Sequence, residues 1–242
     1  MLQLKDVTIS YKNEPTVEHF NLNMKQGQIV SLVGESGSGK TTVIRAILGL
    51  LAGGGKVSEG SVLFENQDLL SYTNEQWRKL RGTQISMIFQ DSGAMMNPTR
   101  KVGKVFTEYI LTHEKISKKE AYEKAVFLLK QVKIPSPEVR IQQYPHELSG
   151  GMQQRVMIAI ALACNPKVLI ADEPTTALDV TIQAQILELM RELKEKENKS
   201  LMLITHDMGV VAEMADDVMV MYAGKEMEYG DVRSIFKDPL HP

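Results

Sequence analysis

Residues 34–41 read Gly34-Glu35-Ser36-Gly37-Ser38-Gly39-Lys40-Thr41, which matches the phosphate-loop pattern G-x-x-x-x-G-K-[ST]. The glycines let backbone N–H groups turn inward around phosphate oxygens, where a side chain would obstruct them. The helix expected after the loop points its positive N-terminal end at the same anion. In this pattern Lys40 reaches the β- and γ-phosphates, and the Thr41 hydroxyl is a ligand of Mg²⁺. The loop therefore predicts a nucleotide site.

The context of the loop agrees with this prediction, because a short apolar run precedes it and a helical pattern follows it. The run is Gln28–Val33, and the helix is expected from Thr41 to the glycines at Gly53–Gly55. In the middle of the chain, Ser117 and Glu120 have capping-box spacing before a long helical pattern. Further strands are expected at Val7–Tyr11, Ser61–Phe64, Gln84–Phe89, Val168–Ala171 and Leu201–Ile204, and further helices at Gly151–Cys164 and Thr181–Glu197.

This alternation of strands and helices favours an α/β sheet with a helical insert between about Gln90 and Ser149. The 242 residues are enough for one large core, and 43% of them are hydrophobic. The net charge of −2 gives no basic field for nucleic acid or anionic lipid. Cys164 is the only cysteine, which excludes a disulfide within the chain. No run approaches the roughly 18 apolar residues of a membrane span, and the charged N-terminus differs from a signal peptide.

A second acidic motif follows the apolar strand expected at Val168–Ala171. Asp172 and Glu173 end this strand, where a Walker-B aspartate holds Mg²⁺ beside a phosphate loop. Asp172 fits that role, and Glu173 would orient and deprotonate the attacking water. The alternative is an ordinary turn after a buried strand, since Glu-Pro is a common chain reversal. The phosphate loop favours the functional interpretation.

Residues 148–155, Leu-Ser-Gly-Gly-Met-Gln-Gln-Arg, resemble the signature motif of ATP-binding cassette (ABC) proteins. Ser149 and the two glycines lead into a helix and so form a second anion-binding N-terminus. One chain has no need of two γ-phosphate sites. The resemblance implies that two cassettes pair head to tail, and that each signature helix closes over ATP held by the other's phosphate loop.

Four further motifs of the family appear in the correct order. Tyr11 resembles the aromatic residue that stacks on adenine, with strand packing as the alternative. Gln90 matches the glutamine that senses Mg²⁺ and the membrane subunit. Residues 176–179, ending in Asp179, match the loop through which two cassettes communicate. His206 matches the switch histidine that contacts the γ-phosphate.

The family implies an α/β phosphate-loop NTPase fold with a mixed core sheet, an antiparallel β subdomain and a helical subdomain. The single ATPase domain would span residues 1–242, with a core lobe at about 1–90 and 160–242 and the helical signature subdomain at about 91–159. The implied catalytic residues are Glu173, His206, Lys40 and Gln90, and the Mg²⁺ ligands are Thr41, Gln90 and Asp172. The implied nucleotide contacts are Tyr11, Gly34, Glu35, Ser36, Gly37, Ser38, Gly39, Lys40, Thr41, Thr42, Ser149, Gly150, Gly151, Gln153 and Asp179.

Three stretches resemble the peptide and nickel importer branch: residues 146–159, 171–181 and 235–242. In that branch two different ATPase subunits usually pair beneath two permease subunits, which an extracellular or periplasmic binding protein supplies with solute. The resemblance implies an ATPase at the cytoplasmic face of the membrane that drives uptake of peptides or of nickel and other metal chelates.

Two departures from the branch affect these expectations. Oligopeptide-type members usually continue past the His-Pro dipeptide with a cysteine-bearing tail, whereas here the chain stops at Pro242, which favours nickel or metallophore uptake over dipeptides. Cys164 lies in an apolar helix pattern and predicts a buried side chain rather than an iron–sulfur cluster. Residues 91–98 keep the Asn-Pro of the branch but lack its usual Pro and Leu. Met95 and Met96 there would pack against the permease or in the core.

Three alternatives remain. A soluble ABC protein acting on DNA or ribosomes would need a long coiled coil before the signature, or two cassettes in one chain, and neither is present in the sequence. A non-hydrolytic adaptor would have degenerate catalytic positions, and all are filled here. A nucleotide kinase or GTPase would leave residues 148–155 unexplained.

Overall fold

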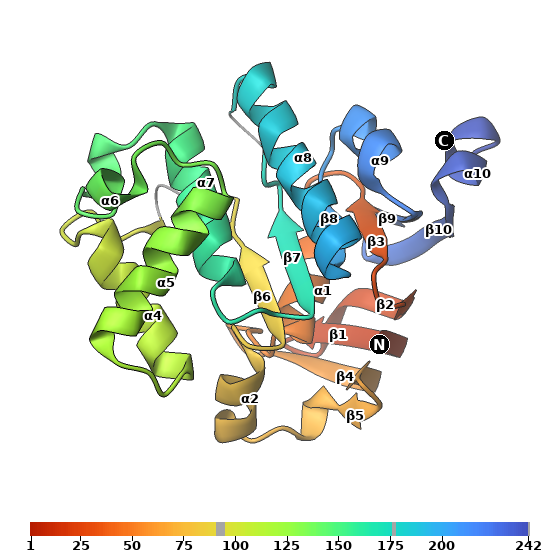
Figure 1. Ribbon diagram of the computed structural model, residues 1–242. Coiled ribbons are helices and arrows are strands. Elements are labelled where there is room, and N and C mark those ends of the chain that lie inside the picture. Colours follow the sequence, from red (N-terminus) through yellow and green to blue (C-terminus); the bar gives the residue numbers. More distant parts are fainter. Residues whose placement is uncertain (91–94, 176–177, 242) are drawn as a thin grey trace. The chain divides into compact units, whose positions relative to one another are not determined.

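The computed structural model describes residues 1–90, 95–175 and 178–241 (Figure 1). The chain divides into two compact units. Unit 1 consists of Met1–Arg78 with Leu193–Pro242, and unit 2 of Lys79–Glu192. The lobes expected from the sequence, with a helical subdomain at about residues 91–159, stay a prediction.

One part of unit 1 is an antiparallel sheet in the order β5-β4-β1-β2. These strands are β1 (Leu2–Tyr11), β2 (Glu14–Met24), β4 (Gly55–Phe64) and β5 (Gln67–Asp68). Along β2, the buried Phe20, Leu22 and Met24 alternate with exposed residues. This period of two gives the sheet one apolar face to pack on.

The other part of unit 1 is built around β3 (Ile29–Val33), which runs parallel to β8 (Ser200–Ile204) on one side and to β9 (Asp217–Tyr222) on the other. Every residue of β3 and β8 is buried, as in parallel strands covered on both faces. Leu32 pairs with Ile204, and Val33 pairs with Val220. The segments that follow β3 and β8 therefore leave the same edge of the sheet. The hairpin partner of β9 is β10 (Lys225–Asp231), which also bridges to β2.

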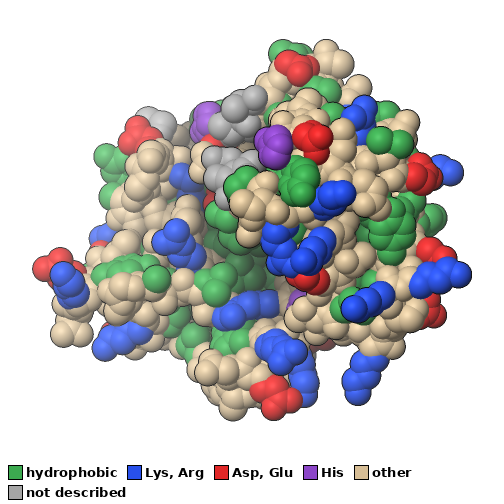
Figure 2. All heavy atoms as spheres, turned by 90° about the vertical axis from the view of Figure 1, so that its left-hand side faces the viewer, with side chains coloured by type: hydrophobic (Ala, Val, Ile, Leu, Met, Phe, Trp, Pro, Cys, Tyr) green, Lys and Arg blue, Asp and Glu red, His purple; other side chains and the backbone are tan. Residues whose placement is uncertain are grey.

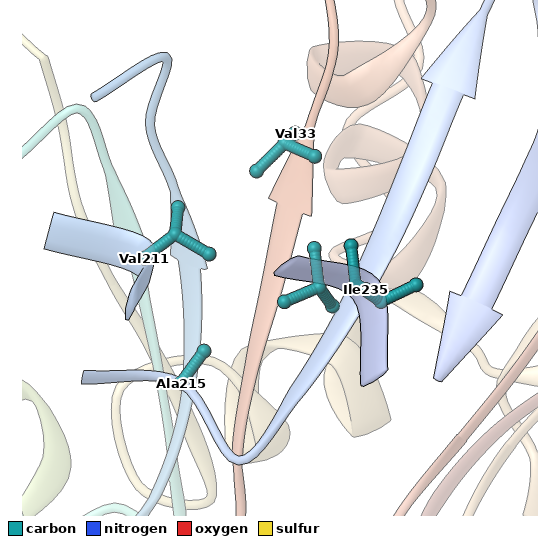
Figure 3. Close-up of a cluster of buried hydrophobic side chains, with 5 residues drawn as sticks. Val33, Val211, Ala215 and Ile235 are labelled. Carbon is teal, nitrogen blue, oxygen red and sulfur yellow. The ribbon is translucent and has the colours of Figure 1, made fainter. Parts of the chain in front are cut away.

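Two short helices close this edge: α9 (Met208–Met214) and α10 (Val232–Lys237). Figure 3 shows the apolar cluster that holds them, in which Val211 from α9, Ala215 directly after it and Ile235 from α10 lie near Val33 at the end of β3. All of these side chains are buried. The end of β3, from which the phosphate loop departs, is thus anchored by tertiary packing.

The helix after the phosphate loop is shorter than expected. Helix α1 spans Lys40–Ile47 and does not reach the glycine run at Gly53–Gly55. Gly49 has a φ of +61°, and the Leu50 N–H bonds the carbonyl of Arg45 at 2.7 Å, as in a Schellman cap. A Cβ on Gly49 would also lie 2.5 Å from the ring of Trp77. The helix therefore ends at this glycine, and the later glycines belong to a turn and to β4. The remaining helices of this part are η1 (Leu69–Ser71) and α2 (Asn74–Leu80), the last of which crosses the unit boundary.

Unit 2 combines a pair of parallel strands with a group of helices. Its strands are β6 (Ile85–Ile88) and β7 (Val168–Asp172), and its helices are α4 (Val102–His113), α5 (Lys118–Gln131), α6 (Pro137–Arg140), η2 (Pro145–Glu147), α7 (Gly150–Leu162) and most of α8 (Val180–Glu197). Helices α4, α5 and α7 pack on one another (Figure 1). The expected capping box is confirmed, because Glu120 N–H donates to Ser117 Oγ and Ser117 N–H donates to Glu120 Oε2.

The α/β fold expected from the sequence is confirmed. The strands β1 and β4 are longer than expected, because they begin at Leu2 and Gly55 rather than at Val7 and Ser61. Apart from these two strands and α1, the strands and helices expected individually from the sequence are observed within about two residues of their expected ends.

Candidate active site

The phosphate loop of unit 1 closes around its own lysine. Lys40 Nζ donates hydrogen bonds to the carbonyl oxygens of Gly34 and Glu35, both at 2.7 Å, and to Ser38 Oγ at 3.1 Å. All three of these acceptors belong to the loop itself. The loop therefore has a shape that places a positive charge at its centre, before any phosphate is considered.

Two of the loop glycines occupy positions that no other residue would fit. Gly34 has a φ of +151°, and a Cβ there would lie 2.2 Å from the Met221 carbonyl oxygen. Gly39, the N-cap of α1, has a φ of +104°, and its Cβ would lie 2.9 Å from Val17 Cγ2. Backbone conformation and close packing thus both require glycine. Glu35, Ser36, Gly37 and Thr41 are exposed, Thr42 is half-buried, and Ser38 is buried.

The phosphate loop is also held by the turn at Ala223-Gly224, which the sequence analysis did not identify as functional. The Gly224 N–H, in the turn between β9 and β10, donates to the Ser38 carbonyl at 3.1 Å, and the Gly224 carbonyl accepts the Glu18 N–H at 2.9 Å. Gly224 has a φ of +79°, and a Cβ would lie 2.1 Å from the Thr16 carbonyl oxygen. The available signal was the Ala223-Gly224 turn between two alternating runs.

His206 follows β8 and leaves the sheet at the same edge as Gly34, because Leu32 and Ile204 are paired. Its neighbours are fixed: Thr205 Oγ1 accepts the Asp207 N–H at 3.0 Å, and Asp207 Oδ1 caps α9 by accepting the Gly209 N–H at 2.9 Å. The exposed imidazole is therefore carried on a well-braced turn.

The Tyr11 side chain packs against the start of β4. It ends β1, and a Cβ on Gly55 would lie 2.5 Å from Tyr11 Cε1, so the ring packs over that glycine. This contact is the packing alternative raised by the sequence. Stacking of Tyr11 on adenine stays a prediction.

In unit 2, two of the predicted catalytic residues are in direct contact. Ile88 pairs with Ala171 across β6 and β7, and Gln90 and Glu173 lie two residues beyond that pair. Gln90 Nε2 donates a hydrogen bond to Glu173 Oε2 at 2.8 Å. Asp172 ends β7 and is half-buried. Parallel register therefore brings together residues far apart in the chain.

Glu173 also has an unusual backbone. Its φ is +46°, in the left-handed region that residues with a side chain rarely adopt. Such a conformation costs on the order of 1–3 kcal/mol and is found preferentially at functional sites. This backbone conformation places the Glu173 carboxylate where the Gln90 amide donates a hydrogen bond to it.

The signature residues form the start of α7. Ser149 is the N-cap, and its Oγ accepts the Met152 N–H at 3.4 Å. Gln153 turns its amide back towards the preceding turn and donates to the carbonyls of Pro145 at 2.8 Å and Leu148 at 3.2 Å. Asp179 caps α8, where its Oδ1 accepts the Ile182 N–H at 2.9 Å. Gln153 and Asp179 therefore have local structural contacts, and their predicted roles at the nucleotide stay predictions.

Comparison with known proteins agrees with this geometry. The family model described as ABC transporter matches residues 17–176. The oligopeptide transport ATP-binding protein OppD of Bacillus subtilis (strain 168) is 52% identical over 100% of this chain and 69% of its own length. The dipeptide transport ATP-binding protein DppD of Lactococcus lactis subsp. cremoris (strain MG1363) is 47% identical over 100% of this chain and 71% of its own length. The chain belongs to the ABC transporter family.

Solved structures of ABC cassettes have the same fold as this one. The ATP-binding cassette MJ0796, described as a dimer in a post-hydrolysis state bound to ADP and Pi, has a TM-score of 0.85 at 31% identity, covering 96% of this chain and 99% of that one. The structure of cbiO1 from Clostridium perfringens, part of the transporter complex cbiONQ, has a TM-score of 0.85 at 28% identity, covering 98% of this chain and 90% of that one. The family, the peptide-importer branch and the ATPase class predicted from the sequence are confirmed.

The surface of the cassette agrees with the charge analysis. On the face in Figure 2, Lys and Arg side chains lie among acidic and uncharged ones, so that face carries both signs of charge. Within the described part of the chain, no helix combines the length and the apolar character needed to cross a membrane. The rival function on DNA or ribosomes is not favoured by the relatives, which are named for transport.

The predicted magnesium ligands, Thr41, Gln90 and Asp172, offer a hydroxyl, an amide and a carboxylate. Such oxygen donors are the ones Mg²⁺ prefers. Because Gln90 gives its amide nitrogen to Glu173, its carbonyl oxygen is the atom left to act as an acceptor or ligand. This donor set fits Mg²⁺.

The remaining predictions concern Cys164, the methionines and the loops. Cys164 is half-buried rather than fully buried as predicted, and this burial raises the pKa of its thiol to about 11. Met96 is buried in the core, whereas Met95 is 54% exposed. Residues 91–94 of the segment after Gln90, and residues 176 and 177 of the loop before Asp179, lie outside the described residues.

Proposed function

We propose that this ABC cassette is the ATP-hydrolysing subunit of a membrane importer that takes up oligopeptides or dipeptides. Its relatives OppD and DppD are named for these solutes, and their similarity extends over the whole chain. Neither name refers to nickel, so peptides replace metal chelates as the favoured solute. The cassette would sit at the cytoplasmic face of the membrane by binding permease subunits.

The observation that carries the catalytic assignment is the hydrogen bond from Gln90 Nε2 to Glu173 Oε2. It holds one oxygen of a carboxylate that directly follows β7, next to Asp172 in the chain. Glu173 would take the proton of the attacking water and line it up with the γ-phosphate. The amide of Gln90 would report changes at the permease side to this carboxylate.

The phosphate loop would supply the electrostatic part of catalysis. Lys40 would exchange its loop carbonyls for β- and γ-phosphate oxygens, and the α1 N-terminus would add the partial positive charge of its N–H groups. His206, held between Thr205 and Asp207, would contact the γ-phosphate. Thr41, Gln90 and Asp172 would hold Mg²⁺, which when bound neutralises negative charge on the phosphate oxygens.

Two cassettes would act together. Ser149 and Gly150 of this chain would close over the nucleotide held by the partner's phosphate loop, and Asp179 would contact the partner near the same nucleotide. ATP would favour the closed pair because it touches both subunits there and only one in the open state. The dimeric form of the similar cassette MJ0796 supports this arrangement. Closing and reopening would drive the permease between its two access states.

The test is Glu173→Gln in the importer reconstituted with its permeases. Loss of the general base should lower phosphate release by roughly 10²- to 10⁴-fold, while ATP binding is retained. Glu123→Gln on the exposed face of α5 is the matched control and should hydrolyse ATP at the normal rate. Normal turnover of Glu173→Gln would rule out the base assignment.

The solute is tested separately by uptake into cells that lack this chain. Uptake of a labelled di- or oligopeptide should be lost and should return with the intact chain but not with Glu173→Gln. Loss of ⁶³Ni²⁺ uptake with normal peptide uptake would instead assign the importer to metals.

A further inference from the structure

The two glycines of the signature turn have different surroundings. A Cβ built on Gly150 would meet no atom within 4 Å, whereas a Cβ on Gly151 would lie 2.7 Å from Ile182 Cγ2. Both residues are in the first turn of α7, and alanine is a better helix former than glycine. The backbone of α7 therefore does not require glycine at either position. Only Gly151 is required by a neighbour within the chain.

That neighbour, Ile182, belongs to α8, which starts at Val180. Ile182 lies in the first turn of α8, and its N–H is bound by the capping Asp179 carboxylate at 2.9 Å. The contact between Gly151 and Ile182 thus brings the first turn of the signature helix against the first turn of α8.

A second contact lies one turn further along both helices. Arg155 of α7, which is 9% exposed, donates from Nη2 to Gln185 Oε1 of α8. Its Nη1 donates to the carbonyls of Val132 and Lys133, at 3.3 and 3.1 Å, where α5 ends. Two successive turns of α7 are therefore matched to two successive turns of α8.

We propose that Ile182 is a positioning residue for the signature motif. By packing on Gly151 it sets the N-terminus of α7 against α8, so that Ser149 and Gly150 reach the partner's nucleotide together with Asp179, the capping residue of α8. The two glycines thus have different roles. The open space beside Gly150 would admit the partner's nucleotide, whereas the space beside Gly151 is occupied by the Ile182 side chain. This assignment rests on the proposed ATPase function.

The experiment measures kcat and KM for ATP hydrolysis by the reconstituted importer. Gly151→Ala should lower kcat by about 10- to 100-fold, since small displacements of binding groups reduce rates by such factors. Adding Ile182→Ala removes the Cγ2 that a new Cβ would meet, and should restore most of the lost kcat. Ile182→Val retains a methyl group at that position and is the matched control, which should give no rescue. Gly150→Ala should lower kcat in a way that neither Ile182 variant relieves.

Both Ile182→Val and Ile182→Ala shorten the same side chain, but only Ile182→Ala removes the atom that a Cβ on residue 151 would meet. Rescue by Ile182→Ala alone would therefore indicate positioning rather than a general change in stability. Full activity of Gly151→Ala, failure of Ile182→Ala to rescue it, or equal rescue by Ile182→Val would each overturn the proposal. Failure of the proposed function looks different: the wild-type importer would then show no ATP turnover that Glu173→Gln removes.

Discussion

The phosphate loop and the signature turn are both glycine-rich segments that open a helix, but they use glycine for different reasons. In the loop, Gly34 and Gly39 have left-handed φ values and would clash with their neighbours if they carried a Cβ. In the signature, the helix has an ordinary Ser149 cap, and its glycines lie inside α7. The proposed function requires the loop to bind phosphate with residues of one chain. The signature turn is an exposed helix start, and the proposed function requires a second cassette to bring a phosphate to it.

Gly34→Ala is the most severe test of this difference. The new Cβ would lie 2.2 Å from the Met221 carbonyl oxygen, and backbone atoms cannot yield as a flexible side chain can. We expect unit 1 to be destabilised by about 3 kcal/mol or more and ATP binding to be lost. Thermal unfolding and binding of a fluorescent ATP analogue measure the two effects.

Gly37→Ala is the control in the same loop. Its φ is +83°, but a Cβ there would meet no atom within 4 Å, so only the backbone cost of roughly 1–2 kcal/mol applies. If Gly34→Ala bound ATP as well as Gly37→Ala does, the close contact between Gly34 and the Met221 carbonyl would not be needed for the ATP-binding conformation of the loop.

Lys40→Met should have the next largest effect. It removes the ammonium group that would exchange its bonds to Gly34, Glu35 and Ser38 for bonds to phosphate oxygens. A hydrogen bond to a charged group contributes about 1.5–3 kcal/mol. ATP affinity should fall by roughly 10- to 100-fold, as measured by calorimetry. Lys56→Met, on an exposed position of β4, should bind ATP normally. An unchanged affinity in Lys40→Met would mean that the backbone alone holds the phosphates.

Ser149→Ala should have the smallest effect on the isolated chain. The cap bond is long, 3.4 Å, so its loss should cost only about 0.5 kcal/mol of stability. ATP affinity of the monomer should hardly change, because Ser149 would act on the partner's nucleotide. In the assembled importer, however, turnover should fall by roughly 10- to 100-fold, since one hydrogen bond to the charged γ-phosphate is lost.

The Ser149 comparison sharpens the distinction between the two regions. A loss of monomer affinity as large as that of Lys40→Met would show that the signature serves the nucleotide of its own chain. The head-to-tail arrangement would then be wrong.

The chain's motifs were enough to predict the α/β fold, the family and the order of most strands and helices. The motifs did not predict features that depend on contacts between distant parts of the chain. Helix α1 ends at Ile47 because Gly49 turns left-handed beneath Trp77, a contact that the local pattern did not reveal. The Gly224 turn that braces the phosphate loop was also missed, because nothing near it in sequence refers to Ser38.

The sequence by itself determined the chemistry of this protein: a phosphate loop, an acidic strand end and a signature turn, each recognisable because it lies within a few consecutive residues. Only the tertiary structure decided which of these residues meet. Gln90 and Glu173, 83 residues apart, come into contact through the register of β6 and β7. The space beside Gly151 is occupied by Ile182 because α7 packs against α8. Such contacts depend on how whole strands and helices pair and pack, which no local stretch of sequence specifies.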